Sequence, residues 1–155
     1  MKQGARQAGY VSQPAAADPR STESWALSEA SRRLVVASKA DDAGKSLREA
    51  LVLNQRLWTI FQSSMTEPDC PLPQEIRDNV LTLSIMMDRQ ILLRLGDLDG
   101  SKLQPMLDIN RCVAEGLAQR PQDAAATLAQ GVQDIAPAGA AAAPPQARVA
   151  VNVSA

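Results

Sequence analysis

The chain has 155 residues, of which 45% are hydrophobic and 3% aromatic, and its 16 Lys and Arg nearly balance its 17 Asp and Glu. This composition suits one small globular domain, and the balanced charge gives no overall field that attracts nucleic acid or an anionic membrane. No histidine is present, which removes the commonest general base and the commonest metal ligand.

The remaining motifs give no setting for catalysis. The sequence contains no glycine-rich phosphate loop and no nucleophile elbow, and its two cysteines, Cys70 and Cys112, form no metal-binding pair. We therefore expect a protein that is not an enzyme, with no catalytic, cofactor or metal site. The start of the chain lacks the apolar run of a signal peptide, and no later run suits a membrane span, so a cytoplasmic location without membrane insertion is expected.

The first predicted helix follows a polar segment, residues 1–20, which we interpret as a flexible leader. Ser21 is a plausible N-cap, and Leu27, Ala30 and Leu34 recur at helical spacing until Asp41, Asp42 and Gly44 end the pattern. The leader is followed by a helical domain that we expect to occupy residues 21–120.

The second predicted helix contains the stretch NQRLWTIFQ, residues 54–62. At about 100° per residue, one side of this helix collects a largely apolar stripe: Leu47, Ala50, Leu51, Leu57, Trp58, Ile60 and Phe61. Asn54 falls inside the stripe, where an amide is costly unless it is hydrogen-bonded. Trp58 and Phe61 are therefore expected in the core.

The third predicted helix, residues 73–95, takes Pro73, the last of three prolines within EPDCPLP, as its first residue and ends at Gly96. One apolar face comprises Ile76, Val80, Leu83, Met87 and Ile91, and a second face, formed by Leu81, Ile85 and Leu92, lies roughly opposite. Two apolar faces indicate either a helix at the centre of its own bundle or a surface that a partner covers.

The fourth predicted helix, residues 101–117, has an apolar stripe that contains Asn110. From residue 121 onward alanine, proline and small polar residues replace the large apolar ones, so we predict a disordered tail over residues 121–155. The expected fold is all-α, a small bundle of about four helices with an Ala/Pro-rich C-terminal tail.

Three motifs together resemble the flagellar biosynthesis regulator FlaF family. They are the run from Asn54 to Phe61, the turn from Cys70 to Pro73, and the segment from Leu103 to Arg111. The likeness covers roughly residues 8–120, although Cys70 and Gln62 replace residues that are usual in the family. We interpret the signature residues as mainly structural: Asn54, Leu57, Trp58, Phe61, Pro71, Pro73, Asp108, Asn110 and Arg111.

The resemblance implies a cytoplasmic factor required for flagellin synthesis and export. Such a factor binds unassembled flagellin as a secretion chaperone and acts in balance with FlbT, which restrains flagellin translation. Two alternatives remain open at this stage. One is direct regulation of flagellin messenger RNA, although nucleic acid is disfavoured by the balanced charge and the scarcity of aromatic residues. The other is a scaffold that binds only FlbT or the export apparatus.

The candidate partner surface is the second face of the third helix. Flagellin's terminal segments are apolar-faced helices, and a second apolar face can hold one by packing a helix into a groove. The candidate residues are Leu81, Ile85 and Leu92, with Met86 as an adaptable neighbour and Arg56 at the flank. The plainer alternatives are that this helix is simply central to the bundle and that Arg56, Arg77 and Arg111 are solvated charges.

Overall fold

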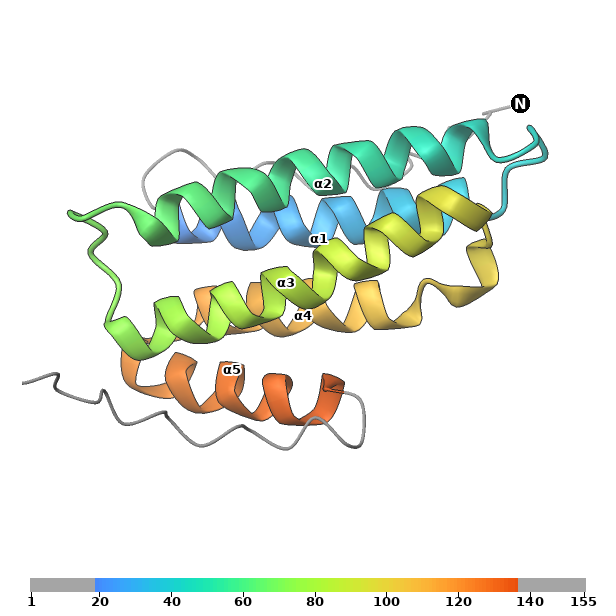
Figure 1. The fold of residues 1–155 in the computed structure, drawn as a ribbon. Helices are drawn as coiled ribbons and strands as arrows, with labels where there is room; N and C mark the ends of the chain where they lie inside the picture. The colour runs from blue at the N-terminus through green and yellow to red at the C-terminus, as the bar shows by residue number, and fades with distance from the viewer. Residues whose placement is uncertain (1–18, 137–155) are drawn as a thin grey trace, which may run out of the picture.

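The structure is a computed structural model that describes residues 19–136, and within this span the chain folds into five α-helices and one short 3-10 helix. The elements in chain order are α1 Pro19–Ala37, α2 Lys45–Thr66, α3 Gln74–Asp97, η1 Gly100–Lys102, α4 Gln104–Ala118 and α5 Pro121–Ile135. Each α-helix runs back against the direction of the one before it (Figure 1). The predicted all-α bundle is therefore confirmed.

A four-helix bundle forms the centre of the domain. α1 packs against both α2 and α4, and α3 packs against α2 and α4 to close the ring. The core joins the apolar stripes of all four helices, as amphipathic helices require if each is to bury its apolar face. Its largest fully buried side chains include Leu27, Leu34, Leu51, Trp58, Ile76, Leu83, Met87, Ile91, Met106 and Ile109.

The helix boundaries follow local backbone chemistry. Gly44 precedes α2 in the left-handed conformation, with φ of 81°, which glycine adopts without steric cost. Pro73 immediately precedes α3 instead of forming its first residue, and α3 continues through Gly96, where the sequence predicted its end. Leu98, also left-handed with φ of 51°, caps α3 by donating its N–H to the carbonyl of Arg94 at 2.8 Å.

Arg77 holds the turn between α2 and α3. Its Nε donates to the carbonyl of Met65 at 2.7 Å, and its Nη2 donates to the carbonyl of Glu67 at 3.3 Å. These carbonyls lie at the C-terminal end of α2, where backbone acceptors have no partner within the helix. The interpretation of Arg77 as a plain solvated charge is therefore wrong, because it caps the preceding helix.

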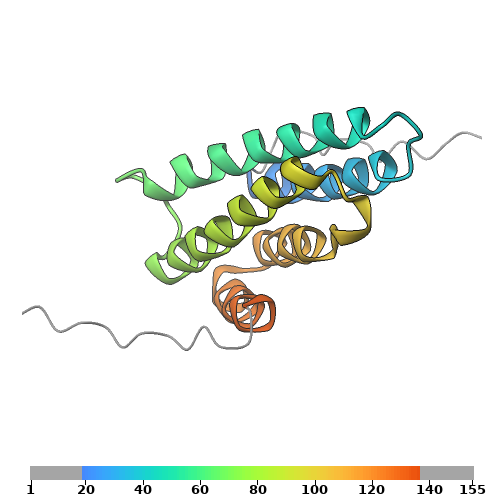
Figure 2. The same cartoon turned by 45° about the vertical axis from the view of Figure 1, so that its right-hand side comes forward.

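The prediction of a disordered tail from residue 121 is wrong for residues 121–135, which form α5. This helix lies along α4 and α3 at the edge of the bundle (Figure 2), and two of its own residues, Ala124 and Leu128, are fully buried. The sequence contains signals for it: Pro121 in the first turn, Asp123 near the N-terminus, and apolar residues at positions 128, 132 and 135. Residues 137–155 of the predicted tail lie outside the described residues.

The predicted leader, residues 1–20, also lies mostly outside the described residues. Its last two residues, Pro19 and Arg20, already belong to α1, so the first helix begins two residues before the predicted N-cap at Ser21. The helical domain in the structure thus extends beyond the predicted 21–120 at both ends.

Two glycine substitutions test the boundary geometry. We expect Gly44→Ala to lower the free energy of unfolding by about 1–2 kcal/mol, because alanine resists the left-handed conformation. Its Cβ would also lie 3.0 Å from Cδ1 of Leu98. The matched control, Gly96→Ala, places a methyl group in open space within α3 and should raise stability by about 0.5–1 kcal/mol. Urea unfolding curves measure both, and equal effects would contradict this description.

Candidate functional site

A chain of hydrogen bonds between side chains crosses the core where the signature motifs meet. Nε1 of Trp58 donates to Oδ1 of Asn110 at 2.8 Å, and Nδ2 of Asn110 donates to Oδ1 of Asn54 at 2.9 Å. Nδ2 of Asn54 in turn donates to the sulfur of Met87 at 3.3 Å. Asn54, Asn110, Trp58 and Met87 are all fully buried. This chain links α2, α4 and α3.

The expectation that Asn54 and Asn110 are buried, hydrogen-bonded amides is confirmed. Burial of an unpaired amide costs free energy, and here Asn110 donates to Asn54, while Met87 and Trp58 pair with the other side-chain polar atoms of the two amides. The partner of Asn54 is 56 residues away in the sequence, so helical periodicity shows that a partner is needed without showing which residue it is. The signature thus encodes a folding constraint at these positions.

The aromatic pair also packs as predicted. Phe61 is buried next to Trp58, with ring centroids 5.9 Å apart and ring planes tilted by 51°, and Leu57 is partly buried against the same cluster. Ile60, which the sequence placed on the same stripe, is 64% exposed on the outer side of α2. The buried stripe of α2 is therefore narrower than predicted, because the Ile60 side chain points away from the side of the helix that carries Asn54 and Phe61.

The second face of α3 divides into two parts. Ile85 and Leu92 are 70% and 65% exposed, which confirms that this helix presents apolar side chains outside the core. Leu81 is partly buried against the core, and Met86 is partly buried on the flank of α3 that faces α5. The structure therefore gives an exposed surface centred on Ile85 and Leu92, with Leu81 at its inner edge, and removes Met86 from it.

A polar contact fixes the border between this surface and α2. Nε2 of Gln62 donates to Oδ2 of Asp88 at 2.7 Å, and Asp88 lies between Ile85 and Leu92 along α3. Arg56 is exposed on α2, but six residues of helix turn it about 120° away from Gln62. Arg56 therefore lies on a different side of α2 from the flank that meets Asp88, and the structure does not group it with Ile85 and Leu92.

The other signature residues lie at the periphery. Pro71 and Pro73 are exposed in the loop that leads into α3. Asp108 accepts hydrogen bonds from Nε2 of Gln104 at 2.9 Å and from Nη2 of Arg111 at 3.1 Å, and the Arg111 side chain is largely exposed. Arg111 therefore combines an exposed charge with a local ion pair. These four residues do not contribute to the buried hydrogen-bond chain.

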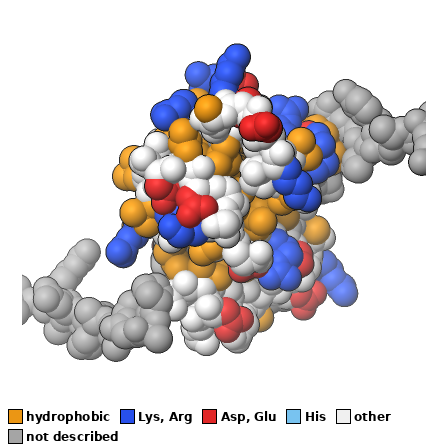
Figure 3. Space-filling model, turned by 90° about the vertical axis from the view of Figure 1, so that its right-hand side faces the viewer, with side chains coloured by type: hydrophobic (Ala, Val, Ile, Leu, Met, Phe, Trp, Pro, Cys, Tyr) orange, Lys and Arg blue, Asp and Glu red, His pale blue; other side chains and the backbone are white. Residues whose placement is uncertain are grey.

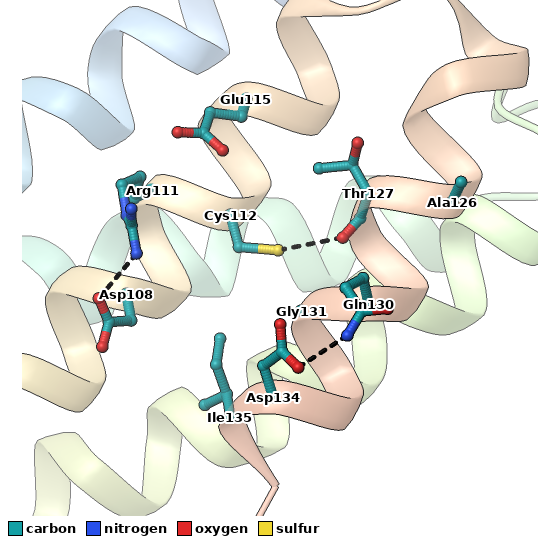
Figure 4. A pocket seen from close by; sticks show the side chains of 10 residues that line it. All are labelled: Asp108, Arg111, Cys112, Glu115, Ala126, Thr127, Gln130, Gly131, Asp134 and Ile135. Atoms are coloured by element: carbon teal, nitrogen blue, oxygen red, sulfur yellow. Dashed lines mark hydrogen bonds and ion pairs between the residues drawn. The ribbon is translucent and has the colours of Figure 1, made fainter.

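A cavity of about 530 Å³ opens between α4 and α5 (Figure 4). Cys112 lies on its α4 wall, and its thiol points at the carbonyl of Thr127 on α5, 3.7 Å away. Burial, with a smaller contribution from the nearby Glu115 carboxylate, raises the pKa of the Cys112 thiol. Among residues 19–136, no group of three His, Cys, Asp or Glu side chains is placed to hold a metal ion.

Comparison with protein families matches residues 7–117 to the model of the flagellar protein FlaF. The chain belongs to the FlaF family. Comparisons with curated proteins and with solved structures find no match. The match to the FlaF model ends at residue 117, so it covers the four-helix bundle and stops before α5. No helix in the described part of the chain is long and apolar enough to cross a membrane.

The buried chain yields a stability prediction. Asn110→Ala removes one side chain and leaves two buried polar groups without partners, Nε1 of Trp58 and Oδ1 of Asn54. We expect the free energy of unfolding to fall by about 2–6 kcal/mol, at about 1–3 kcal/mol for each of the two unpaired groups. Chemical denaturation followed by tryptophan fluorescence measures the change.

A double-mutant cycle separates the shared hydrogen bond from simple loss of packing. The Asn54→Ala and Asn110→Ala substitutions should be non-additive by at least about 0.5 kcal/mol, since either one already breaks the bond between them. Asn79→Ala, at a partly exposed position on α3, serves as the asparagine control and should change stability by less than about 0.5 kcal/mol. Additive effects of the two core substitutions would refute the coupling.

Proposed function

We propose that this FlaF-family protein is a cytoplasmic flagellum assembly factor that binds unassembled flagellin as a secretion chaperone, in balance with FlbT. Membership of the FlaF family makes the chain a flagellar protein, which is the coarse part of this function. The finer part, capture of flagellin, is supported mainly by one observation: α3 exposes Ile85 and Leu92 although its opposite face is fully buried.

The spacing of the exposed side chains suits a helical partner. Ile85 and Leu92 are seven residues apart, so they lie two turns apart on one line along α3. A helix with an apolar face can lie against such a line and cover both side chains at once. Full burial of one exposed side chain of this size contributes about 1.5–3 kcal/mol. The two side chains can therefore supply a substantial part of the binding free energy.

The surface chemistry disfavours messenger RNA as the direct ligand. Single-stranded RNA binding relies on exposed aromatic side chains and a basic groove. Trp58 and Phe61 are buried, which removes them as stacking platforms. At the end of the bundle where α3 leads into α4, Lys and Arg side chains alternate with acidic and apolar ones (Figure 3). The mixed charge supports a protein partner over a polyanion.

One binding experiment distinguishes the partners. The purified protein is mixed separately with monomeric flagellin, FlbT and the flagellin leader RNA, and each mixture is run by size exclusion at physiological salt. We expect a complex with flagellin. A complex with FlbT alone would favour the scaffold, and an RNA complex that weakens steeply with added salt would favour direct control of the messenger RNA.

The docking surface is tested by matched charge substitutions. We expect Ile85→Asp and Leu92→Asp each to weaken flagellin binding by about tenfold or more, because a carboxylate on the contact face must be desolvated. The control is Ile60→Asp, which places the same charge at an equally exposed isoleucine on α2. Circular dichroism should show all three variants folded, since none of these side chains belongs to the core. Equal flagellin affinity in all three variants would remove α3 as the docking surface.

A further inference from the structure

α5 follows the end of the segment that matches the FlaF model. The match ends at residue 117, and α5 begins at Pro121 after a connection of only Gln119 and Arg120. In Figures 1 and 2 the helix lies alongside α4 and α3, outside the four-helix ring. The bundle therefore carries a groove between α3 and α4, and α5 occupies it as an added fifth helix.

The fit between α5 and α4 relies on two glycines that face each other's helix. Leu128 packs against Gly116 so closely that a Cβ at 116 would lie 2.9 Å from Cγ and Cδ2 of Leu128. Gly131 faces Cys112, and a Cβ at 131 would lie 2.0 Å from the Cys112 sulfur. Ala124 is fully buried one turn before Leu128. The groove thus accepts a helix whose contact face reads small, large, small at positions i, i+4 and i+7.

The attachment of α5 is lighter than that of the other helices. Among the described side chains of α5, Ala124 and Leu128 are the buried ones, whereas α2 buries six residues and α4 buries seven. Its polar links include the 3.7 Å contact of the Cys112 thiol on α4 with the Thr127 carbonyl and the 2.8 Å bond from Oγ1 of Thr127 to Oε1 of Gln119 in the connection between the two helices. The cavity of Figure 4 further separates the two helices on one side.

The groove and the exposed line of α3 lie on different flanks of the same helix. Met86, Gln90 and Leu93 face the cavity that ends at Ile135 of α5, whereas Ile85 and Leu92 point outward. A cargo with an apolar helix near each terminus presents two helices to such a domain. One can lie against Ile85 and Leu92, and the other needs a second surface.

We propose that the α3–α4 groove is a second binding site for an amphipathic partner helix and that α5 is its built-in occupant. The partner helix carries the same small, large, small contact face, and it replaces α5 when it binds. This proposal rests on the proposed function in naming a terminal helix of unassembled flagellin as that partner. The two-residue connection holds α5 near the groove at a high effective concentration. A partner helix therefore replaces α5 only if it binds the groove more strongly than the tethered α5 does.

Two variants of the full chain shift α5 in opposite directions. Leu128→Asp places a charge in the buried contact and should release α5 while leaving the groove intact. Gly131→Cys, in a Cys70→Ser background, allows an oxidised link to Cys112 that holds α5 in place. The Cβ atoms would lie 3.2 Å apart, slightly under the usual range of roughly 3.5–4.5 Å, and the Cys112 sulfur must rotate away from the new Cβ, from which it would otherwise lie 2.0 Å. Ala126→Asp, at an exposed position of α5, is the charge control.

The first readout needs no flagellin. A fluorescein-labelled peptide of residues 121–135 is titrated with each variant, and binding is followed by fluorescence anisotropy. We expect Leu128→Asp to bind this peptide at least about tenfold more tightly than the wild type and the Ala126→Asp control, since the tethered helix no longer competes. The oxidised Gly131→Cys chain should bind it less than the wild type does. Equally weak binding by Leu128→Asp and wild type would overturn the proposal.

The second readout uses flagellin and separates the two proposals. Flagellin should bind the reduced Gly131→Cys chain at least about tenfold more tightly than the oxidised chain, and it should displace the peptide from Leu128→Asp. Flagellin that binds the oxidised and reduced chains equally well overturns the groove proposal and leaves the proposed function intact. Peptide binding to Leu128→Asp with no flagellin binding to any variant establishes the helix groove and refutes the proposed function.

Discussion

A hydrogen-bonded pair of amides joins α2 and α4 across the centre of an apolar core, although these two helices are not neighbours in the ring. Asn54 and Asn110 face each other from these two helices, and Trp58 completes the set by donating its indole N–H to Asn110. A shift of α2 relative to α4 that separates Asn54 from Asn110 would leave Oδ1 of Asn54 and Nδ2 of Asn110 buried without this bond, and an unpaired buried polar group is costly. The pair therefore selects one arrangement of the helices as well as stabilising it.

The fixed arrangement determines what the domain presents to a partner. Met87 receives the amide of Asn54, so the inward face of α3 is defined, and Ile85 and Leu92 are left on the outer face. On the other side, the position of α4 places Gly116 and Cys112 where α5 can approach closely. Both proposed helix-binding surfaces thus lie on helices that the buried hydrogen-bond chain joins, although no residue of that chain reaches either surface.

The sequence predicts the features of the fold that recur with the helical period. The apolar stripes of α2, α3 and α4 and the burial of Asn54, Trp58 and Phe61 follow from a period of about 3.6 residues. Periodicity does not show which distant residue pairs with a buried amide. The sequence therefore indicated that Asn54 needs a hydrogen-bond partner, but not that Asn110 is that partner. It also assigned Ile60 to the core, although this residue lies about 100° round the helix from Phe61 and is 64% exposed.

α5 shows why composition alone misled the prediction for the tail. Its residues are mostly small, and small residues offer little apolar area to an isolated helix. Against α4, however, Ala124 and Gly131 allow a close approach that larger side chains would prevent, and Leu128 fills the space above Gly116. The stability of α5 thus lies in complementarity between two surfaces, and neither sequence segment shows that complementarity by itself.

The two tryptophans provide the most direct measurement of the buried amide contact. The indole N–H of Trp58 is buried and bonded to Asn110, whereas Trp25 is only partly buried on α1. Hydrogen exchange followed by NMR should show the Trp58 indole proton exchanging only through global unfolding, with a nuclear Overhauser contact to the Asn110 amide and much faster exchange at Trp25. Exchange at Trp58 as fast as at Trp25, without that contact, would contradict the proposed basis of the fold.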